Sequence, residues 1–147
     1  MKTFDVIISL LLCISCSHTP SLTESLNQAE ELLDCHPDTS LAILREIDRS
    51  LLISPKIEAT YSLLSAIAYD KNYIDVESDS IIAPALKYYL RKGNNDEKLK
   101  TLYYRGIVER NKGNDEDAMR WYAQAYKYAE EAKDKIMAGR LYTAMMI

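Results

Sequence analysis

The chain has 147 residues, of which 48% are apolar and 27% are charged. That length allows one domain with a modest core, and the composition is ordinary for a globular protein. The net charge of −4 provides no basic surface, which argues against binding to nucleic acid or to an anionic membrane through positive charge. With four glycines, four prolines and few β-branched runs, the composition favours helices.

The first residues have the organisation of a secretory leader. Lys2 supplies a positive charge, and an apolar run follows at residues 6–14. A helix needs about 20 apolar residues to span a bilayer, so this run is too short for a transmembrane segment. It has the length of a signal-peptide core instead. We therefore expect residues 1–15 to be a signal peptide and not part of the fold.

The leader ends in Ser15 and Cys16. A small residue before a cysteine resembles the lipobox of bacterial lipoproteins. The resemblance implies cleavage before Cys16 and lipidation (palmitate) of this cysteine. It also implies that the protein is held on a membrane of the bacterial cell envelope, facing the periplasm, with residues 16–20 as a tether. An uncleaved anchor or simple secretion are the alternatives.

The first two helices are predicted from capping residues and proline. Ser21 and Glu24 have the spacing of a capping box, which satisfies free amides at a helix start. The apolar period continues to about Cys35, and Pro37 ends this helix, because the residue before a proline avoids the α region. Asp38 is expected to cap the second helix.

The next two helices are predicted in the same way. Ser54 and Pro55 are a favoured pair at a helix start, as cap and first helical residue. A fourth helix is expected at residues 79–91, with Pro84 in or near its first turn. Gly93 is expected to end it in a left-handed conformation.

Residues 98–133 read as two antiparallel helices joined by a tight turn at Gly113. Gly106 and Ala125 are small where the helices would approach closely, and Tyr122 is large where the gap needs filling. Asn94 and Asn114 are expected to cap the two helices. Their buried stripes follow the 3.6-residue period and comprise Leu99, Leu102 and Gly106 in the first helix, and Ala118, Tyr122, Ala125, Ala129 and Ala132 in the second.

This helix pair resembles the tetratricopeptide repeat (TPR), a helix–turn–helix of about 34 residues. Arg105 and Glu109 depart from the family pattern, which has Leu and Tyr there. A generic amphipathic helix pair is the alternative. Carried over by alignment on Gly106, the repeat-defining positions are Leu102, Gly106, Gly113, Ala118, Tyr122 and Ala125.

Earlier repeats are more degenerate. Ala85 is separated from Ala118 by the same spacing that separates Tyr89 from Tyr122, and this spacing is close to the TPR period. The resemblance therefore implies an all-α solenoid of antiparallel helix pairs over residues 21–147, with about three pairs and one unpaired helix.

Such arrays bind peptides along the concave face, which is lined by the first helix of each repeat. Lys100 and Arg110 are expected to meet a carboxylate through charge-assisted hydrogen bonds. Tyr69 and Tyr103 are expected to supply contact area, although core filling is the alternative for tyrosines at helical spacing. The implied groove residues are Lys100, Tyr103, Ile107, Arg110 and Asn111 in one repeat, and Tyr69 and Asp70, with Ser62 and Ala66, in the preceding one.

The tail resembles the first helix of a further repeat. Ile136, Leu141 and Met145 are apolar and no following helix covers them, which predicts a truncated array, or a fragment, that aggregates or dimerises through residues 136–147. An apolar C-terminus packed on the preceding helix is the alternative.

No catalytic constellation is visible in the sequence. His18 and His36 lack partners at metal-ligand spacing, and no phosphate-binding glycine loop occurs. We therefore expect no enzyme activity, no cofactor and no metal site.

The layout resembles bacterial TPR regulators that begin with such a leader and, in longer members, cross the membrane to a DNA-binding region. The expected function is a membrane-tethered interaction module for a protein or peptide, which would be the sensor part if the protein is a longer regulator, with no nucleic-acid binding in this segment. The alternative is a binding lipoprotein of a nutrient-uptake complex, with Trp121 as its aromatic platform for sugar.

Overall fold

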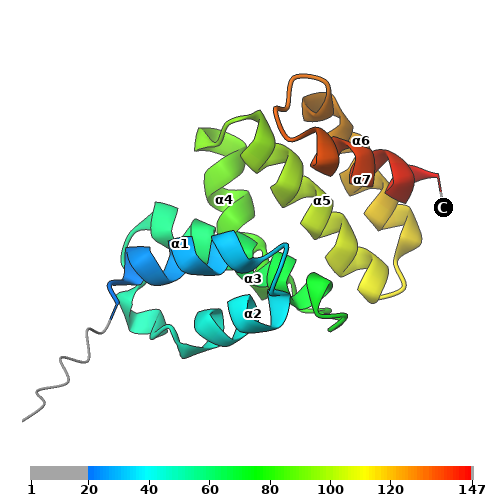
Figure 1. Ribbon diagram of the computed structural model, residues 1–147. Coiled ribbons are helices and arrows are strands. Elements are labelled where there is room, and N and C mark those ends of the chain that lie inside the picture. The colour runs from blue at the N-terminus through cyan, green and yellow to red at the C-terminus, as the bar shows by residue number, and fades with distance from the viewer. Residues whose placement is uncertain (1–19, 147) are drawn as a thin grey trace, which may run out of the picture.

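Residues 20–146 are described by the computed structural model, and within them the chain is helical and has no strand. The all-α class predicted from the sequence is confirmed over this range. The helices follow one another in a compact stack (Figure 1). Their bounds are α1 Leu22–Leu32, α2 Pro37–Glu46, the 3-10 helix η1 Arg49–Leu51, α3 Pro55–Lys71, the 3-10 helix η2 Asp79–Ile81, α4 Ala83–Lys92, α5 Asn95–Asn111, α6 Asp115–Ala129 and α7 Lys135–Met145.

Each α-helix packs on the next one along the chain, and alternate helices also touch. α1 contacts α3, α3 contacts α5, and α5 contacts α7. Figure 1 shows the chain advancing from α1 and α2 at one end to α6 and α7 at the other, with α3, α4 and α5 between them. The odd-numbered helices therefore form a continuous row, and a groove can run across that row.

Three predicted helix starts are confirmed. Ser21 Oγ accepts a hydrogen bond from the Glu24 N–H, and the Glu24 carboxylate accepts one from the Ser21 N–H at 2.7 Å. Asn94 and Glu97 make the same reciprocal pair at the start of α5. Ser54 Oγ accepts a hydrogen bond from the N–H of the third residue of α3. These side chains satisfy amides that the helices themselves leave free.

Three details of the predicted helix ends are wrong, although Asn114 does precede α6 and Gly93 does follow α4. Asp38 does not cap α2, because the helix already begins at Pro37, whose fixed φ suits a first turn. Asn114 makes no capping bond; its amide donates instead to the Glu109 carboxylate at 2.8 Å. Gly93 is extended (φ −76°, ψ 157°) and not left-handed. A side chain is still excluded there, because an added Cβ would lie 2.7 Å from the carbonyl oxygen four residues earlier.

The predicted helix at 79–91 is divided in two. An irregular connection follows α3, then η2, and α4 begins only at Ala83, with Pro84 in its first turn as expected. Tyr73, at φ 57°, turns the chain into this connection. Ser62 Oγ donates to the Ile81 carbonyl at 2.6 Å and ties η2 to α3. Residues 72–82 therefore run back beside α3 in place of a longer helix.

The closest packing joins α5 to α6 through Gly106 and Tyr122. The Tyr122 ring is fully buried and fills the space that a side chain at position 106 would need. An added Cβ on Gly106 would lie 2.7 Å from Tyr122 Cδ1 and 2.9 Å from Cζ, and closer still to Cε1. Gly113, at φ 80°, makes the tight turn between the helices. Both predicted stripes are buried throughout, at Leu99, Leu102, Gly106, Ala118, Tyr122, Ala125, Ala129 and Ala132.

An ionic network occupies the two positions of α5 that depart from the TPR pattern. Arg105 and Glu109 form an ion pair, and the Glu109 side chain also accepts from Lys112 at 3.2 Å. Arg105 lies 3.2 Å from Asp79 of η2, to which Lys112 is also paired. Glu109 is almost fully buried. These side chains thus tie α5 to the connection before α4 by charge.

Helix α7 is partly covered, although the sequence predicts that its apolar side chains lack a covering helix. Leu141 is fully buried, so the prediction is wrong for this residue, whereas Ile136 is 76% exposed, as predicted. One face of α7 packs on α5 and α6, in agreement with the alternative of an apolar C-terminus packed on the preceding helix. It comprises Met137, Ala138, Leu141 and Ala144.

Candidate functional site

A groove crosses the row of odd-numbered helices, and we call it the central groove. Its cavity measures about 290 Å³ and is bounded by the end of α1, the middle of α3, the first half of α5 and the start of α7. The residues that line it are Glu30, Leu33, Asp34, Leu63, Leu64, Ile67, Lys100, Tyr104, Asp134, Ile136, Met137 and Arg140. Apolar side chains of α3 form part of it, and charged side chains of the other three helices contribute much of the rest.

Two of the cations in or beside the central groove are already paired. Lys100 Nζ lies 3.0 Å from Asp134 at the start of α7, with both side chains about one third exposed. Lys71 Nζ lies 2.7 Å from Asp34 at the end of α1. Lys100 was expected to bind a ligand carboxylate, but in this structure it joins α5 to α7. Its charge is therefore offset before any ligand arrives.

A second cavity of about 420 Å³ continues the central groove between α5 and α7. Tyr103 and Arg110, both predicted to belong to a ligand surface, line it from α5. Arg110 donates to the Ala144 carbonyl at 3.0 Å, and its guanidinium carbon lies 5.2 Å from the Tyr122 ring centroid. Tyr103 stacks against the same ring at 5.5 Å between centroids. Both residues thus support the packing of α7 on α5 and α6.

Arg140 lines both cavities and is exposed. Among residues 20–146 it has no ion-pair partner within 4.0 Å, in contrast to Lys71 and Lys100. It is therefore the cation of the central groove that is available to an anionic ligand. The sequence prediction did not include Arg140, although the repeat spacing could have identified it. Arg140 follows the predicted groove residue Ile107 by the same spacing that separates Ala85 from Ala118.

Asp70 contributes the opposite charge near this cation. Burial raises the pKa of its carboxyl above the ordinary value, and the positive charge of Arg140 works against that rise. Burial likewise raises the pKa of the Tyr103 hydroxyl. At neutral pH the tyrosine is therefore an uncharged hydrogen-bonding group on the wall beside Arg140.

The other predicted groove residues face the 72–82 connection. Asn111 donates to the Val76 carbonyl at 3.2 Å, and Ile107 is half-buried beside it, around a void of only about 10 Å³. The Tyr69 ring lies beneath the guanidinium of Arg45, 5.4 Å from its centroid. The long connection before α4 packs on Ile107, Asn111 and Ala66, and Ser62 is hydrogen-bonded to it. The structure thus separates them from Lys100, Tyr103 and Arg110.

Other candidate sites were sought in the described residues. Between residues 20 and 146 no group of three or more His, Cys, Asp or Glu residues could hold a metal ion. In the same range no helix is long and apolar enough to cross a membrane. Cys35 is a free, exposed thiol. The predicted signal peptide and lipidated Cys16 lie outside the described residues.

Trp121, the aromatic residue considered for sugar binding, is half-buried on α6. The guanidinium carbon of Arg105 lies 5.2 Å from its ring centroid. One face of the ring is therefore engaged by the ionic network, which leaves a single face for any ligand.

With this geometry in hand, we compared the chain with known proteins. No protein family matches it, and neither a curated protein nor a solved structure is significantly similar to it.

Proposed function

We propose that this chain is a TPR-like, non-catalytic interaction module that binds a peptide carboxylate in the central groove. The row of α1, α3, α5 and α7 supports a solenoid of helix pairs, because each pair then presents its first helix on one surface. The observation that supports a carboxylate ligand is the position of Arg140, which lines both cavities. Its guanidinium has no ion-pair partner in the described chain. Guanidinium groups bind carboxylates with two parallel hydrogen bonds.

The apolar part of the groove suits a peptide better than a free anion. Leu63, Leu64 and Ile67 of α3 line the same cavity as Ile136 and Met137 of α7. A peptide that places a carboxylate on Arg140 would lay its preceding side chains along these apolar groups. Ligand sites of this kind combine an apolar lining with a few placed polar groups.

The binding test uses an array of random decapeptides with free C-termini, together with amidated copies. We expect the wild-type chain to select peptides whose carboxylate reaches Arg140, and Arg140→Gln to weaken their binding about tenfold to a hundredfold, since a charge-assisted hydrogen bond contributes roughly 1.5–3 kcal/mol. The matched control is Arg120→Gln on α6, whose guanidinium is exposed and paired with Glu116 and Asp117. Equal losses in both variants would refute the assignment of Arg140.

The membrane tether is part of the proposal. Its support is the apolar run at residues 6–14 followed by Ser15 and Cys16. A single acyl chain binds membranes only marginally, so stable attachment needs two or more. Palmitate labelling in a bacterial host should mark the wild type and Cys35→Ser but not Cys16→Ser. Label retained in Cys16→Ser would refute lipidation at this residue.

A further inference from the structure

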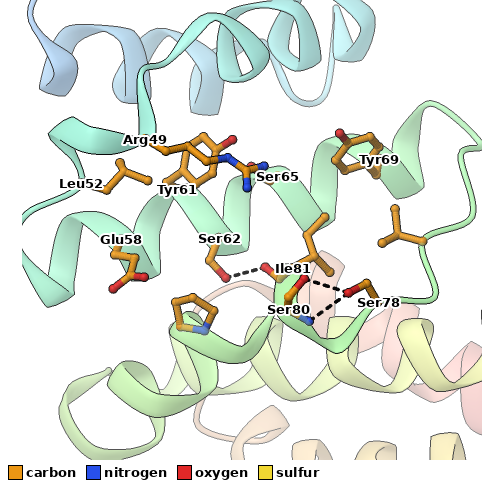
Figure 2. A pocket seen from close by; sticks show the side chains of 12 residues that line it. Arg49, Leu52, Glu58, Tyr61, Ser62, Ser65, Tyr69, Ser78, Ser80 and Ile81 are labelled. Carbon is orange, nitrogen blue, oxygen red and sulfur yellow. Dashed lines mark hydrogen bonds between the residues drawn. The ribbon is translucent and has the colours of Figure 1, made fainter.

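A separate pocket of about 440 Å³ lies along α3, away from the central groove (Figure 2). α3 provides the long wall, with Glu58, Tyr61 and Tyr69 along it. Arg49 of η1 enters from one side, and Ser78 and Ser80 of the connection before α4 lie on the other. Volumes of this size are typical of small-molecule sites.

The walls of this pocket are held by contacts within the protein. Ser62 Oγ donates to the Ile81 carbonyl at 2.6 Å and accepts from the Ala85 N–H at 3.4 Å. The hydroxyls of Ser78 and Ser80 are hydrogen-bonded to each other at 2.8 Å. The side of the pocket opposite α3 is therefore fixed before a ligand binds, which lowers the entropic cost of binding.

Two opposite charges line the pocket without neutralising each other. Within residues 20–146, neither Arg49 nor Glu58 has an ion-pair partner within 4.0 Å. Arg49 places its guanidinium carbon 5.8 Å from the Tyr61 ring centroid, while Glu58 belongs to the first turn of α3. A ligand with a single charge would be attracted by one of these groups and repelled by the other. A ligand that carries both charges would satisfy both.

The remaining lining distinguishes between neutral ligands with many hydroxyls and zwitterions. Arg49 covers one face of Tyr61 and Arg45 covers one face of Tyr69, so neither ring offers two open faces on which a sugar could stack. Ser65 lies in the wall, is almost fully buried, and its hydroxyl has no hydrogen-bond partner in the described chain. A ligand carbonyl is a suitable acceptor for this hydroxyl, and apolar side chains at Leu52 and Ile81 suit an aliphatic group.

We infer that this pocket binds a short zwitterionic peptide. Its terminal carboxylate would bind Arg49, its terminal ammonium would bind Glu58, and its aliphatic side chain would contact Leu52 and Ile81. A peptide carbonyl would accept a hydrogen bond from the Ser65 hydroxyl. The site is independent of the central groove and of Arg140, because its residues belong to a different surface of α3.

The test is a titration with the dipeptide Ala-Leu, followed by the amide chemical shifts of the full chain. We expect saturable shifts at residues that line the pocket, and about tenfold weaker binding in Arg49→Gln and in Glu58→Gln. Both replaced side chains are exposed, so folding should be unaffected, and circular dichroism checks this. Arg120→Gln should bind as the wild type does.

The matched ligand is the same dipeptide with an acetylated N-terminus and an amidated C-terminus, which carries neither charge. We expect it not to bind. Equal binding of the capped dipeptide, or no saturable shifts with Ala-Leu at millimolar concentration in a folded protein, would overturn the inference. Displacement of Ala-Leu by a neutral disaccharide would overturn it as well, because it would identify the hydroxyls and not the two charges as the recognition element.

Discussion

Replacing Gly106 by alanine tests the close approach of α5 and α6. The new Cβ would lie 2.7 Å from Tyr122 Cδ1, whereas real Cβ atoms essentially never approach within 3.0 Å. The ring is completely buried, with Tyr103 stacked at 5.5 Å and the Arg110 guanidinium carbon at 5.2 Å, so little room exists for it to move. Overpacking of this kind costs about 1–3 kcal/mol, occasionally more.

Alanine also stabilises a helix interior relative to glycine by about 1 kcal/mol, which opposes the steric cost. Taking the steric term at about 3 kcal/mol, because the ring is confined, Gly106→Ala should lose about 2 kcal/mol of unfolding free energy. For a chain of this length that is roughly 6–8 °C in Tm. The assay is urea unfolding followed by circular dichroism.

Gly139 is the matched control, because it also lies within a helix and an added Cβ there meets nothing within 4 Å. Gly139→Ala should therefore gain up to about 1 kcal/mol from helix propensity alone. If both variants were stabilised equally, the contact between Gly106 and Tyr122 would not limit the approach of the helices. A loss of stability in Gly139→Ala would mean that α7 is covered in solution.

Two further predictions concern buried polar groups. The Asn114 amide and the flanking cations lower the pKa of Glu109 to about 2 from an ordinary value of 4.5, so its stabilisation is complete above about pH 4.5 and is lost as the pH falls towards 2. Glu109→Gln should lose roughly 1–2 kcal/mol of unfolding free energy at pH 7. The variant should also show a flatter pH dependence of urea unfolding between pH 2 and 4.5. An unchanged pH profile would argue against the ionic network. Tyr122→Phe removes a buried hydroxyl that has no hydrogen-bond partner in residues 20–146, so calorimetry should find it neutral or up to about 1 kcal/mol more stable. A clear loss would reveal a partner for that hydroxyl.

The candidate site could be predicted only in part. Lys100 and Tyr103 do line the surface between α5 and α7, as alignment on Gly106 implied, and the repeat offset from Ile107 would have added Arg140. The spacing between repeats does not indicate which charged side chains already have an ion-pair partner in the folded protein. Lys100 is paired with Asp134, which belongs to the start of another helix, and this pair forms only once α7 lies against α5.

Local chemistry in the sequence determined the helices themselves. The capping box of Ser21 and Glu24 and the tight turn at Gly113 depend on residues within one turn of each other, so short spacing is enough to predict them. Tertiary structure alone decided which surfaces remain open. Asn111 meets the Val76 carbonyl, far away in the sequence, because residues 72–82 fold back beside α3, and no local pattern encodes that path. Burial and charge pairing between distant segments, not residue type, distinguish the available Arg140 from the cations already paired within the protein.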